Sequence, residues 1–317
     1  MTARAKNGLR WMAAVVLLML VAWYVDPAKL KAALARGEPA YFAAALVFAI
    51  LSNVASALRW SHIARILNLA APYPRLLLMY WRGMALNTVL PGATLSGDTL
   101  RAMQLHRLGN PLWPASLSVV FDRLTGIWTL CIMSLVAAVV VFFSGADAPR
   151  SGMGLSTFPS TEVIVLYGIV LAGLIAMPFY PFHALSFPIG AHPKLAKVRY
   201  AYREFVDHSG AIRERFIGPF LVSLVVQCFS AGALWLCARA VGLPLSTVMV
   251  FALAAPIFGM SALPVSVSGW GTREFATVAV FGLVGVESEF AAATAVLYGL
   301  CGALQGVIFS PLLLTKV

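Results

Sequence analysis

The sequence predicts an all-α polytopic membrane protein with about six full transmembrane helices and two re-entrant helical hairpins in an inverted-repeat arrangement. Three observations support this fold class. The 317 residues are 61% hydrophobic and only 11% charged, whereas soluble domains carry about 25% charged residues. Apolar runs long enough to cross a bilayer recur along the whole chain. Two other apolar regions are interrupted by the same short pattern of Pro, Gly, Ser and Arg.

Six apolar segments approach or exceed the ~20 residues that a spanning helix needs. The first begins near Arg4, Lys6 and Arg10, and no small-residue cleavage site follows it. We therefore expect an uncleaved helix instead of a signal peptide. The chain is predicted to be a single integral membrane domain, residues 1–317. Its predicted spans are 10–25, 40–59, 115–143, 162–181, 217–241 and 290–314.

Two further apolar regions, 76–105 and 246–286, are predicted to form re-entrant hairpins of two half-helices each. Both contain Leu-Pro, a few small residues and then Ser-Gly-x-x-x-Arg, which begins at Ser96 in the first region and at Ser268 in the second. Non-helical backbone survives at membrane depth only where protein or a water-filled cavity shields it. Matching interruptions in two halves of a chain indicate a binding site at the interface of an internal repeat.

The Lys and Arg residues orient these segments, because cytoplasmic loops are enriched in them. With the amino terminus in the cytoplasm, most basic residues lie on the cytoplasmic side, and Arg59 ends the second span there. We expect both termini in the cytoplasm and the protein in the bacterial inner membrane. The two hairpins then enter from opposite sides, as in an inverted repeat of halves 1–143 and 162–317. The net charge of +11 is interpreted as basic residues beside anionic lipid, with no nucleic acid as partner.

Charged side chains inside or beside the apolar runs are candidates for a substrate path, because an ion at the bilayer centre costs about 2.5–3.5 kcal/mol on insertion scales. Neighbouring helical residues point about 100° apart. Asp122 is therefore not expected to pair with Arg123, nor Arg273 with Glu274. Instead we expect an Asp of one half to pair with an Arg of the other. The alternative is that these charges only fix helix register as buried ion pairs.

Free N–H groups at the start of a half-helix attract anions, and both Ser-Gly pairs stand where such a helix would begin. Arginines beside them suit a phosphate group. The predicted substrate-binding residues are Arg82, Asn87, Ser96, Gly97, Asp98, Arg101, Asp122, Arg123, Ser268, Gly269, Gly271, Arg273 and Glu274. No catalytic residue, metal site or cofactor is predicted, because the four cysteines lack metal-ligand spacing.

Two weaker patterns concern helix packing. Asn87, Gln227 and Gln305 are polar residues on apolar segments, where interhelical hydrogen bonds are a common role. Gly302-x-x-x-Gly306, with Gly299 one turn earlier, predicts a close-packed helix face. Neither pattern indicates a function by itself.

Four motifs follow one another within the region from about residue 80 to 310. They are Asn87-x-x-Leu90-Pro91-Gly92, Ser96-Gly97-Asp98-x-x-Arg101, Phe121-Asp122-Arg123-x-x-Gly126 and Pro264-x-Ser266-x-x-Gly269-x-Gly271-x-Arg273-Glu274. On these motifs the chain resembles the lysylphosphatidylglycerol synthase transmembrane-region family of flippase-like integral membrane proteins. Full-length synthases of that family resemble this chain plus a soluble aminoacyl-transferase domain. That domain is absent here, so the resemblance does not imply the synthase reaction.

The resemblance implies that a polar lipid moves between leaflets. We expect a flippase or transporter that carries a polar, anionic or phosphate-bearing lipid by alternating access, and not an enzyme. The candidate lipids are a phospholipid, an aminoacylated phospholipid, a glycolipid and a polyprenyl phosphate. A separate lipid-modifying enzyme and a second copy of the chain are candidate protein partners. Two alternatives stay open: a membrane-embedded lipid-modifying transferase with Asp98 or Asp122 as base, and a small-solute or ion transporter.

Overall fold

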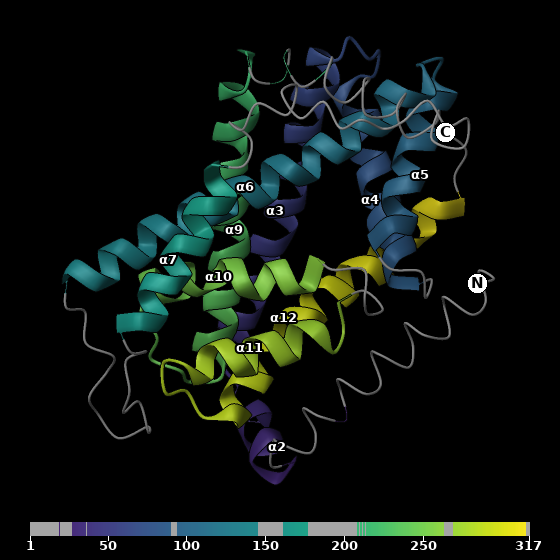
Figure 1. Cartoon of the computed structure of the whole chain (residues 1–317). Helices are drawn as coiled ribbons and strands as arrows, with labels where there is room; N and C mark the ends of the chain where they lie inside the picture. The colour runs from purple at the N-terminus through teal and green to yellow at the C-terminus, as the bar shows by residue number, and fades with distance from the viewer. Residues whose placement is uncertain are drawn as a thin grey trace.

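The computed structural model describes residues 27–35, 37–89, 94–144, 161–176, 212, 214–262 and 269–314, together with the single positions 19, 208 and 210. Every regular element within these residues is a helix (Figure 1). The elements are α2 (Pro27–Ala35), α3 (Pro39–Ile66), α4 (Tyr73–Val89), α5 (Thr94–Arg107), α6 (Leu112–Ser144), α7 (Thr161–Ala176), α9 (Ile217–Ala240), α10 (Thr247–Ala262), α11 (Thr272–Gly282), α12 (Ser288–Phe309) and the 3₁₀ helix η4 (Ser310–Leu314).

Four helices are long and apolar enough to cross a membrane, namely α3, α6, α9 and α12 extended by η4. The prediction of an all-helical, multi-pass membrane protein is confirmed in this form. Of the other two predicted spans, 10–25 lies outside the described residues apart from Met19. The described helix α7 has 16 residues, fewer than the ~20 that spanning requires.

Helices α3 and α9 form an antiparallel pair at the centre of the molecule (Figure 1). Near its middle, the Ser52 hydroxyl lies 2.7 Å from the Ser230 hydroxyl. At one end of the pair, the backbone N–H of Glu38 donates to the carbonyl of Ala240 at 2.9 Å. The helices approach closely because small residues line the contact, and a Cβ at Gly232 would lie 2.9 Å from the ring of Phe48.

A helical hairpin follows each member of this pair. The hairpin α4–α5 begins after the carboxyl end of α3, and the hairpin α10–α11 begins after the carboxyl end of α9. Because α3 and α9 are antiparallel, the two hairpins are attached at opposite ends of the pair. The described helices α4–α5 and α10–α11 overlap the predicted regions 76–105 and 246–286. Residues 90–93 and 263–268, where the sequence predicts the breaks, lie outside the described residues, so the re-entrant form stays a prediction.

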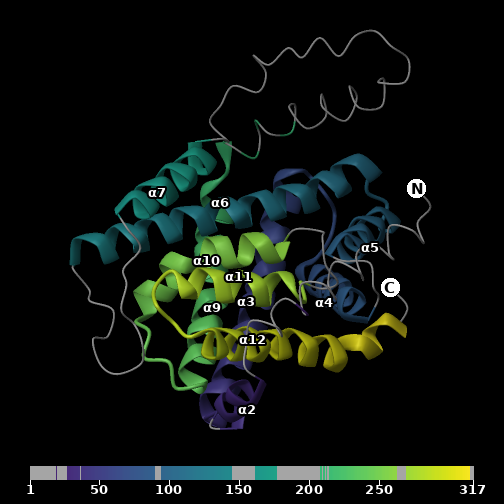
Figure 2. The same cartoon turned by 60° about the horizontal axis from the view of Figure 1, so that its bottom comes forward.

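A long helix completes each half, and the halves interlock through these helices. In Figure 2, α10 and α11 lie between α6 and α12. The hairpin α4–α5 packs on α12 of the other half, where the rings of Trp81 and Phe309 stack with centroids 3.8 Å apart. Gly306 permits this approach, because a Cβ there would overlap the side chain of Thr88. Each hairpin therefore lies against the long helix of the opposite half.

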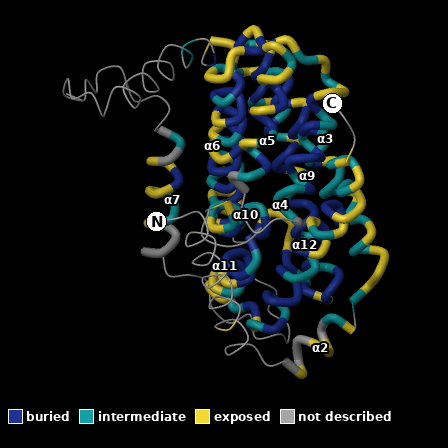
Figure 3. The backbone as a smooth tube through the Cα atoms, turned by 90° about the vertical axis from the view of Figure 1, so that its right-hand side faces the viewer, coloured by how far each residue is buried: buried dark blue, intermediate teal, exposed yellow. Residues whose placement is uncertain are grey.

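The long helices carry many exposed apolar side chains. Figure 3 shows exposed positions along α6. On α6 these exposed side chains include Val136, Val139, Phe142 and Phe143. Several charged side chains are instead buried, Asp122, Arg82 and Glu274 among them. This inversion of the usual soluble pattern is typical of helices that face lipid outside and a polar interior.

Candidate functional site

A buried cluster of arginine and aspartate side chains joins α3, α5 and α6. Asp122 lies at its centre: one carboxylate oxygen accepts a hydrogen bond from Arg59 Nε at 2.8 Å, and the other accepts one from Arg101 Nη2 at 2.9 Å. All three residues are at most 5% exposed. The cluster, completed by Asp98 and Arg123, is called the arginine–aspartate cluster below. Charge-assisted bonds to both oxygens offset the cost of burying the central carboxylate.

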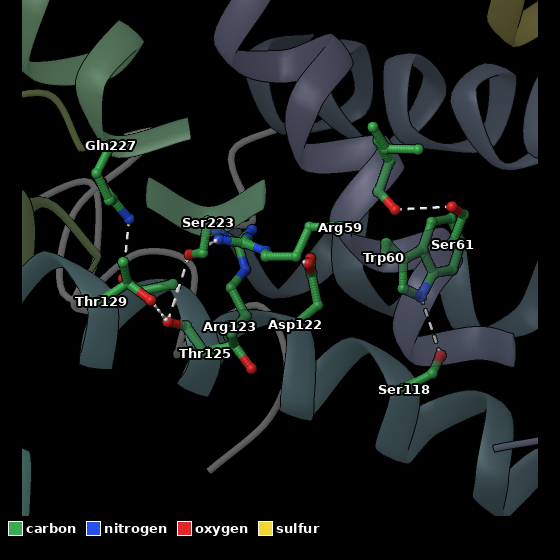
Figure 4. Close-up of polar contacts among 12 residues, drawn as sticks. Arg59, Trp60, Ser61, Ser118, Asp122, Arg123, Thr125, Thr129, Ser223 and Gln227 are labelled. Carbon is green, nitrogen blue, oxygen red and sulfur yellow. Dashed lines mark hydrogen bonds and ion pairs between the residues drawn. The ribbon is translucent and has the colours of Figure 1, made fainter. Parts of the chain in front are cut away.

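Arg59 also links the cluster to the other half of the protein. Its Nη1 donates to the hydroxyl of Ser223 on α9 at 2.9 Å. Figure 4 shows Arg59 reaching both Asp122 and Ser223 from α3. A Cβ at Gly126 of α6 would lie 2.8 Å from Arg59 Nη1, so the absence of a side chain there makes room for the guanidinium.

Arg101 is held between two aromatic rings. Its Cζ lies 4.2 Å from the centre of the Trp60 ring and 4.5 Å from that of Tyr80, distances at which cation–π attraction operates. The Trp60 indole N–H donates to Ser118 at 3.0 Å, as Figure 4 also shows. Within the described part of the chain, Arg101 Nε and Gln104 Oε1 are the two buried side-chain atoms without a hydrogen-bond partner. The two rings and Asp122 thus hold the Arg101 guanidinium in one position.

Asp98 and Arg123 form the accessible edge of the cluster. Arg123 donates to both carboxylate oxygens of Asp98, from Nε at 3.0 Å and from Nη2 at 2.9 Å. The Arg123 side chain is 42% exposed and that of Asp98 17%. Arg101 Nη1 lies 3.5 Å from the same Asp98 carboxylate. Three arginines and two aspartates leave the cluster with one surplus positive charge.

A second charged group lies at the amino end of α11. Glu274 accepts the backbone N–H of Gly271 at 2.6 Å through one carboxylate oxygen, and its other oxygen accepts Arg273 Nη2 at 2.6 Å. The Arg273 guanidinium lies 4.9 Å from the Trp270 ring centre. A Cβ at Gly299 of α12 would overlap that guanidinium. Glycine at this position therefore admits Arg273 to the α11–α12 interface.

The expectation that Arg273 and Glu274 would not pair is wrong. They lie in the first turn of α11, where the long Glu side chain bends back toward the free N–H of Gly271. Its carboxylate then comes within reach of the neighbouring Arg273 guanidinium. In the helix interior the rule holds, because Asp122 bonds Arg59 and Arg101 while Arg123 bonds Asp98.

The expected pairing of an Asp in one half with an Arg in the other is also wrong. Every ion pair found among the described residues joins groups of the same half. The reason is geometric, because α3, α5 and α6 converge on one another. The polar contacts described between the halves are hydrogen bonds that lack a carboxylate. One of them joins Asn53 on α3, as donor, to Gln305 on α12 at 2.8 Å.

Asn87 and Gly97 lie within the first hairpin. The Asn87 side-chain carbonyl accepts the backbone N–H of Gly97 at 2.7 Å, which ties α4 to the first turn of α5. A Cβ at Gly97 would overlap the carbonyl of Gly83 and lie 2.7 Å from the Asn87 amide. Gly97 thus permits the contact of α4 with α5. Helix α5 begins at Thr94, before the predicted start at Ser96.

Arg82 does not join the arginine–aspartate cluster. It is 2% exposed, and its Nε donates to the carbonyl of Leu312 in η4 at 2.8 Å. A cation at the carboxyl end of a helix is stabilised by the helix dipole.

Gly269 and Gly271 flank Trp270 with φ angles of 76° and 85°. Ser268 lies outside the described residues.

The sequence prediction missed one member of the cluster, Arg59, and two residues that contact it, Trp60 and Ser223. Arg59 was placed at the cytoplasmic end of a span, whereas α3 continues to Ile66. The signal was present, because Trp60, Ile63 and Ile66 continue an apolar spacing of three beyond Arg59. Nothing in the sequence distinguishes Ser223 from other hydroxyls on α9.

The predicted interhelical hydrogen bonds are confirmed for Gln227 and Gln305. Gln227 donates to the carbonyl of Gly126 on α6 at 2.8 Å, and Gln305 accepts from α3 as described above. The predicted glycine face is confirmed in part. Gly299 packs closely against Arg273 and Gly306 against Thr88, whereas a Cβ at Gly302 would meet nothing within 4 Å.

The chemistry of the clusters favours anion binding. Guanidinium groups bind carboxylate and phosphate oxygens in the same bidentate geometry, and Arg123 holds Asp98 in this way. No set of three or more His, Cys, Asp and Glu in the described ranges is grouped to hold a metal ion.

Comparison with known proteins agrees with the motifs. The family model described as the lysylphosphatidylglycerol synthase TM region matches residues 11–309. A UPF0104 membrane protein from Methanothermobacter thermautotrophicus is 24% identical over 307 residues, which cover 91% of this chain and 86% of that protein. Both matches extend over the charged clusters and both hairpins.

Proposed function

Because this chain belongs to the family of the lysylphosphatidylglycerol synthase transmembrane region, we propose that it moves a polar lipid with an anionic or phosphate-bearing headgroup between the leaflets of the bacterial inner membrane. Family membership supports a role connected with membrane lipids. The surplus positive charge of the arginine–aspartate cluster supports the choice of an anionic headgroup.

One observation carries the proposal: a net-positive cluster lies among apolar helices, and one of its arginines is exposed. Charged groups inside a membrane are costly and are usually retained for a substrate or ion path. Asp122 and Arg101 are fully enclosed and would position the site. Arg123, with 42% of its side chain exposed, would meet the headgroup.

In the proposed cycle the phosphate exchanges with Asp98 for the Arg123 guanidinium. Asp98 bonds Arg123 through both oxygens in the resting arrangement. When phosphate takes its place, Asp98 keeps a partner, because Arg101 Nη1 lies 3.5 Å from its carboxylate. The exchange would replace one bidentate pair by another and would leave no charge unpaired.

In the proposed architecture the chain crosses the membrane six times, both hairpins are re-entrant and both termini are cytoplasmic. The attachment of α4–α5 and α10–α11 at opposite ends of the α3–α9 pair supports an inverted repeat. In that arrangement the arginine–aspartate cluster would receive the headgroup from one side. Arg273, at the start of α11, would receive it from the other.

The test is leaflet exchange of a fluorescent anionic phospholipid in proteoliposomes that contain the purified full chain. The double variant Arg101→Gln/Arg273→Gln is expected to reduce the exchange rate by at least about 30-fold, since truncating a buried charge partner costs about 2–5 kcal/mol. Arg75→Gln, the same change at an exposed position of α4, is the control and is expected to exchange at the wild-type rate. Exchange that survives the double variant would overturn the proposal.

The same liposomes separate the alternatives. Chemical conversion of the labelled lipid would identify a transferase. Uptake of a water-soluble anion without lipid exchange would identify a solute transporter.

A further inference from the structure

Helix α10 contains a proline at a point where its backbone hydrogen bonds are interrupted. Pro256 lies inside the helix, which runs from Thr247 to Ala262. Proline has no N–H, so it cannot donate to the carbonyl of Ala252, four residues earlier. An unpaired carbonyl inside a membrane protein is costly unless another group satisfies it. The partner of Ala252 therefore has to come from outside α10.

Helix α7 supplies that partner. The hydroxyl of Tyr167 donates to the carbonyl of Ala252 at 2.7 Å. Tyr167 packs in an apolar cluster with Ala255 and Phe251 of α10 and Leu130 of α6. Its bond to the backbone of α10 thus lies beside apolar side chains of both α6 and α10.

Helix α6 supplies a second contact, to the carbonyl one residue earlier. The Ser134 hydroxyl donates to the carbonyl of Phe251 at 2.9 Å and accepts the backbone N–H of Ala255 at 3.1 Å. In an α-helix the N–H of Ala255 would donate directly to the carbonyl of Phe251. Ser134 is fully buried, and a side chain that bonds both members of such a pair is a recognised cause of helix bending.

Both contacts come from one side of α10, along which α6 and α7 lie (Figure 2). Beyond Pro256, the chain continues from α10 to Gly269 and Gly271, and then to Arg273 at the start of α11. A change of angle at Pro256 would therefore move the segment that carries Arg273. The first hairpin has no equivalent, because the one proline of α4, Pro74, lies in its first turn.

We propose that α10 bends at Pro256 during the protein's cycle, and that Ser134 and Tyr167 are positioning residues that hold the hinge in its present angle. The hinge makes α10–α11 the moving hairpin and α4–α5 the static one. Its role in transport rests on the proposed function, whereas the hinge itself does not.

The experiment is hydrogen–deuterium exchange, followed by mass spectrometry, on the full chain in lipid nanodiscs. Pro256→Ala restores an N–H for the Ala252 carbonyl and is expected to slow exchange in peptides from 250–262 by about fivefold. Ser134→Ala/Tyr167→Phe removes both external contacts and is expected to speed exchange there by about tenfold. Peptides from α4 are expected to be unchanged in both.

Thr129→Val is the matched control. Thr129 is a buried hydroxyl of the same helix α6, but it donates to Thr125 of its own helix at 2.8 Å. Exchange in 250–262 that is unchanged in Pro256→Ala, or changed as much by Thr129→Val as by Ser134→Ala/Tyr167→Phe, would overturn the hinge. Pro256→Ala decides the matter if the double variant unfolds.

Lipid exchange measured on the same samples separates the two proposals. Slower lipid exchange in Pro256→Ala supports both of them. If the deuterium result holds while wild-type protein exchanges no lipid, the hinge stands and the proposed function fails.

Discussion

The two hairpins share an order of elements but are held together in different ways. In the first, α4 and α5 touch backbone to backbone at Gly83 and Gly97, and Asn87 closes the gap with a hydrogen bond. In the second, the turn depends on the left-handed backbone of Gly269 and Gly271, and α10 relies on neighbours for its own hydrogen bonds. The first hairpin depends on a close contact between its two helices, and the second on the backbone conformation of its glycines. Substitutions should therefore affect the two hairpins unequally.

The charged groups differ in the same sense. In the first half, Asp122 bonds two arginines from two other helices. In the second half, Glu274 bonds an adjacent arginine and a backbone N–H of the same segment. The first group ties three helices together, whereas the second orders only the start of α11. The following predictions test this contrast, from the largest expected effect to the smallest.

Asp122→Asn is expected to lower the free energy of unfolding by ~3–5 kcal/mol, because it leaves Arg59 without its buried countercharge and Arg101 with only the more distant Asp98. The measurement is reversible unfolding in mixed detergent micelles. Asp98→Asn is the comparison at the accessible edge, where Arg123 is 42% exposed and water can solvate it. An equal loss in both variants would contradict the central role of Asp122.

Gly97→Ala is expected to cost ~2–3 kcal/mol, since the added Cβ overlaps the carbonyl of Gly83 and backbone must move to accommodate it. Gly302→Ala, on a helix face where a Cβ meets nothing within 4 Å, serves as the control and should cost far less. Thermal unfolding of the two variants in one detergent is the measurement. Similar midpoints would show that α4 and α5 do not depend on this contact.

Gly269→Ala is expected to cost ~1–2 kcal/mol, because Ala adopts its φ of 76° only with strain. Space is not the cause, as the nearest atom to a Cβ there is 3.4 Å away. Gly269→Asn tests this reason, since Asn tolerates the left-handed region better and should lose less stability. Unfolding midpoints that rank Asn below Ala would argue against backbone strain.

Asn87→Ala is expected to cost ~1 kcal/mol, the value of one hydrogen bond to the Gly97 N–H. Asn87→Asp keeps an acceptor at the same place, and a carboxylate is favourable at a helix amino end. It should therefore retain most of the wild-type stability. A larger loss in Asp than in Ala would assign the Asn87 amide a role besides accepting this hydrogen bond.

Much of this arrangement could be predicted from the sequence. The hairpins followed from Pro and Gly inside apolar runs, since such breaks are tolerated only where protein shields them. Asp98, Arg101, Asp122 and Arg123 were singled out because charge is rare in apolar segments. Each of these inferences depends on local composition alone, which the sequence states directly.

The pairing of those charges could not be predicted in the same way. It depends on which helices converge. The prediction assumed that charged residues of opposite halves meet, whereas Asp122 meets arginines of its own half. Arg59 was missed because its charge was taken as the end of a span, while the apolar spacing continued through Trp60 and Ile63. The stack of Arg101 between Trp60 and Tyr80 likewise depends on tertiary contact.

Among the described residues, each ion pair stays within one half, and this has a consequence for how the halves can move. Across the seam between the halves, hydroxyl and amide groups pair, such as Ser52 with Ser230 and Asn53 with Gln305. Interhelical bonds of this kind in membranes are worth about 0.6 kcal/mol on average, close to thermal energy. Pulling a guanidinium from a carboxylate in the same low dielectric would cost several times more. The two halves can therefore exchange partners along the seam while each carries its ionic groups intact.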